Sequence, residues 1–277
     1  TVKGVVGYDM TGLFVGSEGT LGVVTEATLA LLHKPDMVLT LLAIFPTPHE
    51  AGRAVAAIFR SRICPRCVEL MDAGALQAVR AQGVGIDPLA GALLLIEVDG
   101  EGPACERDME RTGEACVAVG ALDVLVAQAG TQSARLWAAR RELSPAVRKL
   151  AKYKLAEDVV VPVFQIPALL EKTEALAERY KVRILTYGHA GDGNMHVNFL
   201  WDDPADLPRV LGAIENLFRD VIALRGTISG EHGIGVLKAP YLGLEQSHEL
   251  VSLQERVKKV FDPKGLLNPG KIFPLRV

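Results

Sequence analysis

Two histidines lie on either side of a tight, glycine-containing turn between residues 188 and 198. The dipeptide Asp192-Gly193 is a favoured centre for a two-residue type I′ hairpin turn, which places His189 directly opposite His196. Side chains that face each other in this way have Cβ atoms about 4.5–5.5 Å apart, so both imidazoles can bind one metal ion at about 2.0–2.1 Å. The alternative is a plain hairpin whose histidines only bond backbone groups. Because side chains alternate between the two faces along a strand, Tyr187 and Asn198 are expected on the same face as the histidines.

A Glu-His pair stands between glycines in the segment from residue 226 to residue 235. Glycines on both sides let the backbone approach a ligand closely and expose the pair. Glu231 can complete a two-histidine, one-carboxylate metal site that leaves coordination positions open for a substrate. His232 can then act as a general base near neutral pH. The alternative is an exposed polar turn, but together with the histidine hairpin the pair predicts a metal-assisted proton-transfer site.

Two further segments have the composition of ligand sites. Residues 16–25 lack the spacing of a dinucleotide fingerprint or a P-loop. Backbone N–H groups around their small residues can still hold the polar atoms of a cofactor, although a plain turn before a strand is the alternative. Arg140 and Arg141 are adjacent in a predicted helix, so they point about 100° apart and one of them can face inward. A buried arginine needs an anion such as a carboxylate, whereas a surface salt bridge with a nearby glutamate is the alternative.

The elements that must position these residues alternate between strands and helices along most of the chain. The sequence Thr47-Pro48-His49-Glu50 is a capping box that opens a helix extending to about Arg60. Two strands, at 182–188 and 195–200, follow each other without a helix, which indicates an α+β fold with a mixed or antiparallel sheet. Further strands are predicted at 21–32, 37–45, 92–98, 122–127 and 158–164, and further helices at 71–81, 103–119, 131–150, 167–180 and 205–224.

The composition excludes several classes of protein. The 277 residues are 49% hydrophobic and 23% charged, which is usual for a soluble globular protein of one large or two modest domains. The 30 basic and 33 acidic residues give a net charge of −3 without a basic stripe, so a nucleic-acid binder is excluded. No apolar run reaches the roughly 18 residues of a membrane span. The 4 cysteines do not make a disulfide framework, and we expect reduced thiols.

In this order, the segments resemble the C-terminal part of the FAD-linked 2-hydroxy-acid dehydrogenases, a family of glycolate oxidase flavin subunits, D-lactate dehydrogenases and D-2-hydroxyglutarate dehydrogenases. The resemblance rests on GLFVGSEGTLGVVTEATL, YGHAGDGNMHVNFL, GTISGEHGIG and FDPKGLLNPGKIF. It implies remnants of a vanillyl-alcohol-oxidase-type FAD-binding domain at residues 1–34 and at residues 226–277. In the second of these segments the chain returns from the substrate domain to the FAD-binding domain. Residues 36–225 are expected to form a ferredoxin-like α+β substrate or cap domain. The family's preceding FAD-binding half, with its pyrophosphate loop, lies before Thr1, so we expect this chain to hold FAD weakly.

The resemblance also implies an activity, the oxidation of a small D-2-hydroxy acid to the 2-oxo acid with FAD and a divalent metal ion, zinc in this family. The substrate is expected to be glycolate, D-lactate or D-2-hydroxyglutarate. The family's metal ligands match His189, His196 and Glu231. The catalytic base matches His232, and the substrate-binding positions match Arg140, Ser144, Lys154, Asn198 and His232. The flavin-contacting positions match Gly16, Ser17, Gly19, Thr20, Gly22, Val23 and Asn268.

Several properties stay open at the level of the sequence. The electron acceptor is an iron–sulfur subunit, a quinone, a cytochrome or an electron-transfer flavoprotein, and a homo-oligomer is expected. The expected location is the cytoplasm, either free or peripheral at the inner face of a membrane. Two alternatives to the dehydrogenase remain: a fragment that binds a hydroxy acid or a partner without turnover, and a zinc hydrolase. The absence of HExxH spacing counts against the hydrolase.

Overall fold

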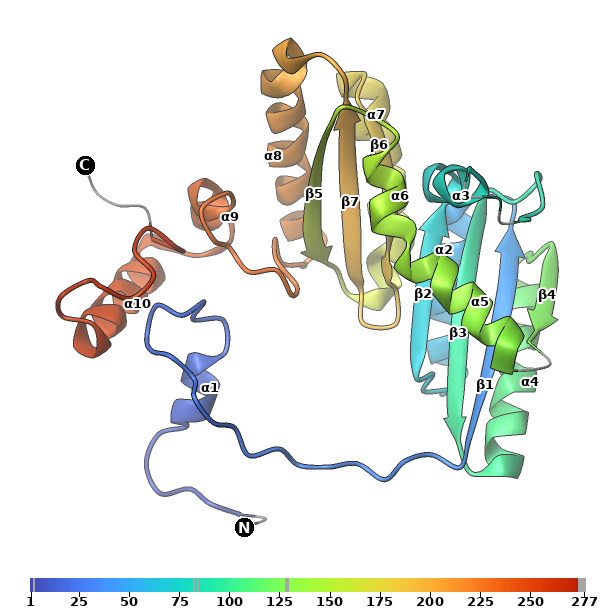
Figure 1. The fold of residues 1–277 in the computed structure, drawn as a ribbon, viewed down its shortest axis with the longest axis horizontal. Helices are drawn as coiled ribbons and strands as arrows, with labels where there is room; N and C mark the ends of the chain where they lie inside the picture. Colours follow the sequence, from blue (N-terminus) through green and yellow to red (C-terminus); the bar gives the residue numbers. More distant parts are fainter. Residues whose placement is uncertain (2, 82, 84, 128–129, 274–277) are drawn as a thin grey trace. The chain divides into compact units, whose positions relative to one another are not determined.

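The computed structural model describes residues 1, 3–81, 83, 85–127 and 130–273 (Figure 1). The chain divides into two compact units, one formed by residues 1–32 with 231–277 and the other by residues 33–230. The assignment of residues 1–34 and 226–277 to a flavin-binding domain stays a prediction. Within the described ranges, no helix is both long enough and apolar enough to cross a bilayer.

An antiparallel sheet forms the centre of the unit at residues 33–230. In the described part of the chain the sheet has seven strands in the order β4-β1-β3-β2-β6-β7-β5, and each neighbouring pair is antiparallel. The strands are β1 (Met37–Phe45), β2 (Cys67–Asp72), β3 (Ala92–Gly100), β4 (Asp123–Val126), β5 (Tyr153–Val160), β6 (Arg183–His189) and β7 (Asn194–Trp201). The predicted α+β class with an antiparallel sheet is confirmed.

Helices cover both faces of this sheet. One face is covered by helices that pack on one another: α2 (Pro48–Arg60), α4 (Gly102–Ala118), α7 (Ile166–Tyr180) and α8 (Leu207–Ala223). The predicted N-cap at Thr47 is confirmed, because Thr47 accepts a hydrogen bond from the backbone N–H of Glu50 at the start of α2, while the carboxylate of Glu50 accepts from the hydroxyl of Thr47. The other face lies under α5 (Gly130–Arg141) and α6 (Leu143–Arg148), with α3 (Ala73–Arg80) beside them (Figure 1). Short 3-10 turns lie at η1 (Val163–Gln165) and η2 (Pro204–Asp206).

The boundary between α5 and α6 divides a segment for which the sequence predicts one helix, 131–150. The break falls at Glu142. Pro145 explains it, because a proline ring inside a helix clashes with the carbonyl four residues earlier, here that of Arg141. The break has a consequence for the site, since Arg140 lies in the last turn of α5.

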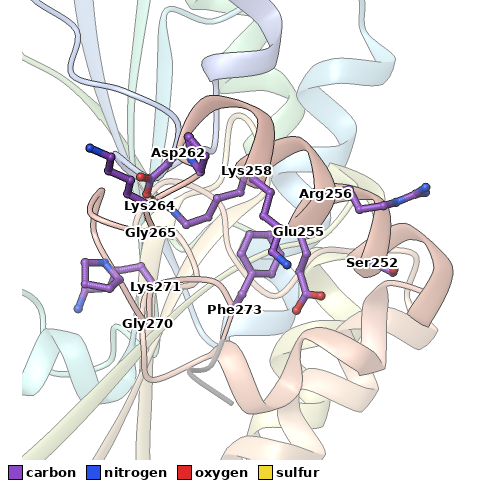
Figure 2. Close-up of a pocket in the computed structure, with 13 residues that line it drawn as sticks. Ser252, Glu255, Arg256, Lys258, Asp262, Lys264, Gly265, Gly270, Lys271 and Phe273 are labelled. Atoms are coloured by element: carbon purple, nitrogen blue, oxygen red, sulfur yellow. Dashed lines mark hydrogen bonds and ion pairs between the residues drawn. The ribbon is translucent and has the colours of Figure 1, made fainter. Parts of the chain in front are cut away.

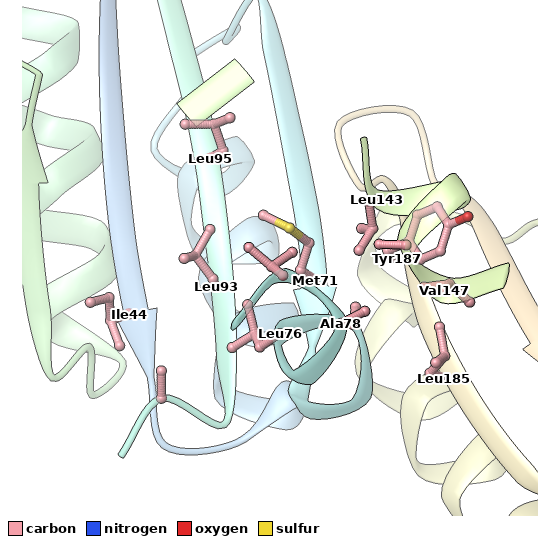
Figure 3. Close-up of a cluster of buried hydrophobic side chains, with 14 of the residues drawn as sticks. Ile44, Met71, Leu76, Ala78, Leu93, Leu95, Leu143, Val147, Leu185 and Tyr187 are labelled. Atoms are coloured by element: carbon pink, nitrogen blue, oxygen red, sulfur yellow. The ribbon is translucent and has the colours of Figure 1, made fainter. Parts of the chain in front are cut away.

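A cluster of buried apolar side chains anchors α6 and α3 to the sheet (Figure 3). Leu143 and Val147, one turn apart on α6, belong to this cluster together with Leu185 and Tyr187 of β6 and Leu76 of α3. Burial of a side chain of this size stabilises a fold by about 1.5–3 kcal/mol. The cluster therefore fixes the junction of α5 and α6 against the strands that carry the predicted site residues.

The second unit, residues 1–32 with 231–277, contains α1 (Met10–Phe14), η3 (Ala239–Tyr241), α9 (Leu242–Glu245) and α10 (His248–Phe261). The strand predicted at 21–32 is wrong, because these described residues form no strand and the side chains of Val23 and Leu31 are 79% and 90% exposed. The alternation of apolar and polar residues is a local pattern. A strand also needs a neighbouring backbone for its N–H and C=O groups.

Candidate active site

The predicted hairpin forms between β6 and β7, but its turn is longer than expected. Tyr187 lies opposite His196 and His189 lies opposite Asn194, so residues 190–193 form the turn. The two-residue turn is therefore wrong, and the two histidines are diagonal neighbours on one face of the sheet. Their ring centroids are 5.4 Å apart and their planes cross at 83°. Potential metal-binding nitrogens of the two rings lie within 4.8 Å of each other, so the two imidazoles are close enough to share an ion.

Contacts from neighbouring strands explain the longer turn. The N–H of Gly191 donates to the carbonyl of Val68 in β2 at 3.1 Å, and the N–H of Val161 donates to the carbonyl of Gly193 at 3.1 Å. Gly193 has a φ of +84°, and an added Cβ would lie 1.9 Å from the oxygen of Val161. Only glycine fits this position without strain. The register of the hairpin is thus determined by tertiary contacts and not by local turn preference.

A buried glutamate that the sequence analysis did not assign to the site connects the hairpin to α5. Glu69 lies opposite His189 in the pairing of β2 with β6. Its Oε1 is 2.5 Å from Nδ1 of His189, and its Oε2 is 2.8 Å from Nε and 2.7 Å from Nη2 of Arg140. The side chain of Glu69 is only 6% exposed. An acidic residue between the apolar Val68 and Leu70 of the strand CVELMD is the signal that could have identified it, since a charge is rarely buried without partners.

Arg140 faces inward, as the sequence predicted for one of the two adjacent arginines. Its side chain is 12% exposed, whereas Arg141 is exposed to solvent. The guanidinium lies 5.2 Å from the centroid of the Tyr187 ring as well as against Glu69. In this structure the anionic partner of Arg140 is therefore Glu69, and the binding of a substrate carboxylate by Arg140 stays a prediction.

Two other predicted substrate residues lie together. Nζ of Lys154 in β5 donates a hydrogen bond to Oγ of Ser144 in α6 at 3.2 Å. Burial lowers the pKa of Lys154, and the nearby charge of Arg148 lowers it further. Lys154 and Asp158 are even-numbered residues of one strand, so they share the sheet face that carries His196.

Asn198 is completely buried on the same face. Its Nδ2 donates to the carbonyl of His196 at 2.9 Å and to that of Leu185 at 3.5 Å. Its Oδ1 is buried and has no hydrogen-bond partner among the described residues. An amide oxygen in this state can accept a hydrogen bond from a ligand, because leaving it unpaired costs free energy.

Asp158, a second residue that the sequence analysis missed, lies opposite His196 in the pairing of β5 with β7. Its Oδ2 accepts hydrogen bonds from Oγ of Ser229 at 3.1 Å and from the N–H of Gly230 at 2.9 Å. A β-bridge between Val160 and Thr227 supports the same segment. The backbone that leads to Glu231 is thereby fixed to β5 up to Gly230.

Glu231 and His232 belong to the unit formed by residues 1–32 and 231–277. Nε2 of His232 is 3.8 Å from Oε1 of Glu231. The loop that they begin is held by Glu18, whose carboxylate accepts hydrogen bonds from the N–H groups of Ile234 at 2.6 Å and Gly235 at 2.8 Å. Glu18 lies within the predicted flavin-contacting stretch but was not itself assigned a role.

The predicted flavin-contacting residues line two hollows of this unit. One hollow, of about 600 Å³, is lined by five of them together with Glu18: Ser17, Gly19, Gly22, Val23 and Asn268. The other, of about 280 Å³, is lined by Gly16, Ser17 and Thr20. Nδ2 of Asn268 also donates a hydrogen bond to the backbone carbonyl of Glu18. The structure thus brings the first and last predicted flavin segments together within one unit.

A third hollow of about 560 Å³ lies beside α10 and is bordered by several cationic side chains (Figure 2). Nζ of Lys258 donates to Asp262 and to the carbonyls of Thr20 and Leu267, each at 2.9 Å. The hydrogen bond from Lys258 lowers the pKa of Asp262 to about 2. The described residues that line this hollow include none that the sequence assigned to a site.

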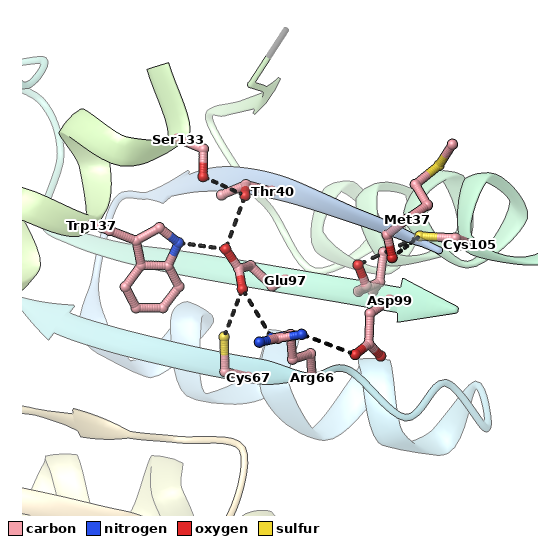
Figure 4. A network of polar contacts seen from close by, with 10 residues as sticks. Met37, Thr40, Arg66, Cys67, Glu97, Asp99, Cys105, Ser133 and Trp137 are labelled. Carbon is pink, nitrogen blue, oxygen red and sulfur yellow. Dashed lines mark hydrogen bonds and ion pairs between the residues drawn. The ribbon is translucent and has the colours of Figure 1, made fainter. Parts of the chain in front are cut away.

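A second, partly buried carboxylate lies under α5 (Figure 4). Glu97 of β3 accepts hydrogen bonds from Nε1 of Trp137 at 2.6 Å and from Oγ1 of Thr40 at 3.2 Å. The thiol of Cys67 also faces it, at 3.9 Å. Burial, followed by the charges of Glu97 and Glu69, raises the pKa of Cys67 to about 12. Cys67 is therefore a protonated thiol at neutral pH and a poor nucleophile.

This fold is that of the vanillyl-alcohol-oxidase-type flavoproteins. Solved structures with the same fold include p-cresol methylhydroxylase with substrate bound, with a TM-score of 0.76 and 14% identity, covering 98% of this chain and 59% of that chain. Alkyldihydroxyacetonephosphate synthase gives a TM-score of 0.64 and 17% identity, covering 95% and 49%. At these identities the likeness concerns the fold alone.

The chain belongs to the family described as "FAD linked oxidases, C-terminal domain", whose model matches residues 34–272. The glycolate oxidase subunit GlcD of Bacillus subtilis is 39% identical, covering 98% of this chain and 58% of the relative. The D-2-hydroxyglutarate dehydrogenase of Stutzerimonas stutzeri is 34% identical, covering 98% and 60%. The D-lactate dehydrogenase of Anaerostipes hadrus is 32% identical, covering 96% and 58%. The predicted family is confirmed, and the chain spans somewhat more than half the length of these relatives.

Proposed function

We propose that the protein catalyses the FAD-dependent oxidation of a small D-2-hydroxy acid to the corresponding 2-oxo acid. The observation that carries the proposal is the link from Arg140 through Glu69 to His189 on one sheet face. A 2-hydroxy acid has a carboxylate that suits an arginine, and next to it a hydroxyl group that suits a metal ion or a base. The names of the relatives, which refer to glycolate, D-lactate and D-2-hydroxyglutarate, support this class of substrate.

The donors on this face fit a divalent cation such as zinc. Ring nitrogens of His189 and His196 lie within 4.8 Å of each other, and two imidazoles that each approach one ion to about 2.0–2.1 Å have their nitrogens at most about 4.2 Å apart, so a small movement of the side chains completes the pair. A carboxylate on the other ring nitrogen commonly accompanies a metal-bound histidine, and Glu69 occupies this place at His189. Glu231 is the proposed third ligand. It follows Gly230, whose N–H is held by Asp158.

The hollows of the smaller unit fit part of a flavin. Small residues at 16–22 expose backbone N–H groups that can donate hydrogen bonds to polar atoms of a cofactor. Asn268 adds a side-chain amide at the edge of the larger hollow. We propose that FAD contacts this surface through the residues that match the family's flavin positions.

The residues of the chain have separate parts in the proposed reaction. Arg140 binds the substrate carboxylate and thereby orients the α-carbon, while Lys154 and Ser144 supply further hydrogen-bond donors. Asn198 offers a buried amide oxygen to the substrate. His232 accepts the proton of the α-hydroxyl group. A bound cation would lower the pKa of this hydroxyl group, and a bound FAD would supply the acceptor for the hydride of the α-carbon.

The partner and the location are further parts of the proposal. The Bacillus subtilis relative is named as a subunit, which supports a protein partner as the electron acceptor. An iron–sulfur subunit is our first candidate, and a quinone, a cytochrome and an electron-transfer flavoprotein are the others. We propose a cytoplasmic protein, which can attach to the inner face of a membrane through such a partner, and a homo-oligomeric state.

Steady-state turnover of the natural full-length protein tests the proposal, with glycolate, D-lactate and D-2-hydroxyglutarate as substrates and an artificial dye as electron acceptor. We expect dye reduction with a D-2-hydroxy acid, loss of the rate with a chelator, and recovery with zinc. The variant His189→Ala should lose the rate even in excess zinc. The matched control His49→Ala, at a half-exposed histidine that pairs with Glu171 on another helix, should keep it.

Two results would contradict the proposal. Ester or amide hydrolysis by the metal-loaded protein without dye reduction would favour a zinc hydrolase. Calorimetric binding of a hydroxy acid without dye reduction would favour a binding protein without turnover.

A further inference from the structure

The carboxylate of Glu69 divides its two oxygens between two proposed site residues. Oε1 meets Nδ1 of His189 at 2.5 Å, and Oε2 meets two nitrogens of Arg140 at 2.7 and 2.8 Å. Oε1 thus contacts a proposed metal ligand, and Oε2 contacts the arginine that is proposed to bind the substrate carboxylate. Glu69 itself is buried, and its partner Arg140 lies in the last turn of α5.

Stability alone is a weak explanation for a charge in this position. Removing two ions from water costs several kcal/mol per ion, and apolar residues of similar volume often replace a buried ion pair without loss of stability. The neighbouring residues of β2, Leu70 and Met71, are apolar and buried. Replacing Glu69 and Arg140 together by apolar residues would therefore suit the fold, which indicates that the ion pair serves the site.

The contact with His189 determines which ring nitrogen can bind a cation. A carboxylate accepts hydrogen bonds, so the proton of a neutral His189 ring is held on Nδ1. The lone pair is then on Nε2, the nitrogen that points away from Glu69. Such a hydrogen bond fixes both the tautomer and the orientation of a metal-binding histidine.

The contact with Arg140 orients the guanidinium in a similar way. Its Nε donates a hydrogen bond to Oε2 of Glu69, its Nη2 lies within ion-pair distance of the same oxygen without a hydrogen bond, and Tyr187 lies against the guanidinium at 5.2 Å. A guanidinium has five N–H donors, so others remain for a second carboxylate. Glu69 and a substrate carboxylate can thus bind Arg140 at the same time.

We propose that Glu69 is a positioning residue that prepares His189 to bind a divalent cation through Nε2 and at the same time orients Arg140 toward the substrate. This inference rests on the proposed function, because it assumes that a cation and a carboxylate bind at this face. It adds a requirement that the proposed function does not contain, namely that metal affinity depends on a carboxylate that does not itself bind the metal.

The variant Glu69→Gln is a sharp test because it keeps the size of the side chain. Arg140 has only donors, so the oxygen of the new amide would turn toward Arg140 and its N–H₂ group toward His189. An N–H group facing Nδ1 reverses the tautomer and moves the ring proton to Nε2. We expect the affinity for Co²⁺ alone, measured by calorimetry and by visible absorption, to fall about 10- to 100-fold.

Glu97→Gln is the matched control. Glu97 is also a carboxylate beneath α5, and it also bonds a side chain of that helix, Trp137, but its ion pair is with Arg66 instead of Arg140. A general effect of removing a carboxylate charge beneath α5 should therefore appear in both variants. We expect Co²⁺ affinity in Glu97→Gln to stay within about twofold of wild type.

Nitrogen NMR of the imidazole rings at alkaline pH gives a readout that does not depend on metal, turnover or a variant. In the unaltered natural protein, Nδ1 of His189 should carry the proton, and a proton on Nε2 would overturn the inference. If wild type binds Co²⁺ and Glu69→Gln binds it equally well, the inference is wrong while the proposed function stands. If wild type binds no Co²⁺, the metal part of the proposed function fails and the inference fails with it.

Discussion

A Cβ atom added to Gly233 would lie 2.6 Å from Oε1 of Glu18. The same carboxylate accepts the backbone N–H groups of Ile234 and Gly235, so the loop at 231–235 is wrapped closely around it. Gly233 also has a φ of +79°, which a residue with a Cβ rarely adopts. The glycine is therefore required both by the backbone conformation and by the close approach of Glu18.

The variant Gly233→Ala should loosen the loop that carries the proposed base. Strain of this kind costs about 1–3 kcal/mol. We expect reduced hydrogen-exchange protection at the amides of Ile234 and Gly235 and at least a tenfold lower kcat/KM in the natural protein. Gly243→Ala is the control, because Gly243 lies in α9 with no atom within 4 Å of an added Cβ, and it should behave like wild type. Equal effects of both variants would contradict this account.

Asp72 should make the unit at residues 33–230 less stable as the pH rises toward neutrality. Its carboxyl group accepts hydrogen bonds from the N–H groups of Ala75 and Thr186, and burial raises its pKa from 3.8 to about 7. Because the folded state binds the proton more tightly, its contribution to stability is fully present below about pH 4 and is lost as the pH rises to about 7. Denaturant unfolding between these pH values measures how steeply the free energy of unfolding falls with pH. This dependence should be weaker in Asp72→Asn.

Asp262 should have the opposite effect in the smaller unit. The hydrogen bond from Lys258 lowers the pKa of its carboxyl group from 3.8 to about 2. The stabilisation is therefore present above about pH 4 and is lost as the pH falls toward 2. Hydrogen exchange of residues 258–267 should report this loss. Lys258→Met should remove the pH dependence, whereas Lys259→Met, at the neighbouring position of the same helix, should retain it.

Local patterns in the sequence predict the parts of this structure that depend on local physics. The N-cap at Thr47 requires only neighbouring residues, and it forms. The predicted turn at Asp192-Gly193 is wrong, yet His189 and His196 still share a face, because the period-two alternation holds for a diagonal pair as well as for a facing pair. The sequence therefore predicts which face of the sheet a side chain occupies better than it predicts which residues lie opposite each other.

Local patterns could not predict the residues that lie in the site because of the order of the strands in the sheet. Glu69 reaches His189 only because β2 pairs with β6, more than 100 residues later in the chain. Asp158 reaches Gly230 only because β5 lies at the edge of the sheet beside the segment at Thr227. In the sequence Glu69 stands between apolar residues and Asp158 stands between Glu157 and an apolar run, which signals a buried charge but not its partner.

The two adjacent arginines provide a test of the substrate role with a control built into the same helix. Lysine at position 140 keeps the charge but lacks the planar fork with which arginine can present separate edges to Glu69 and to a substrate carboxylate. A hydrogen bond to a charged group contributes about 1.5–3 kcal/mol, so Arg140→Lys should raise KM for the hydroxy acid about 10- to 100-fold. Arg141→Lys alters an exposed residue and should leave KM within about twofold of wild type. An equal increase of KM in both variants, or none in Arg140→Lys, would mean that Arg140 serves only as the partner of Glu69.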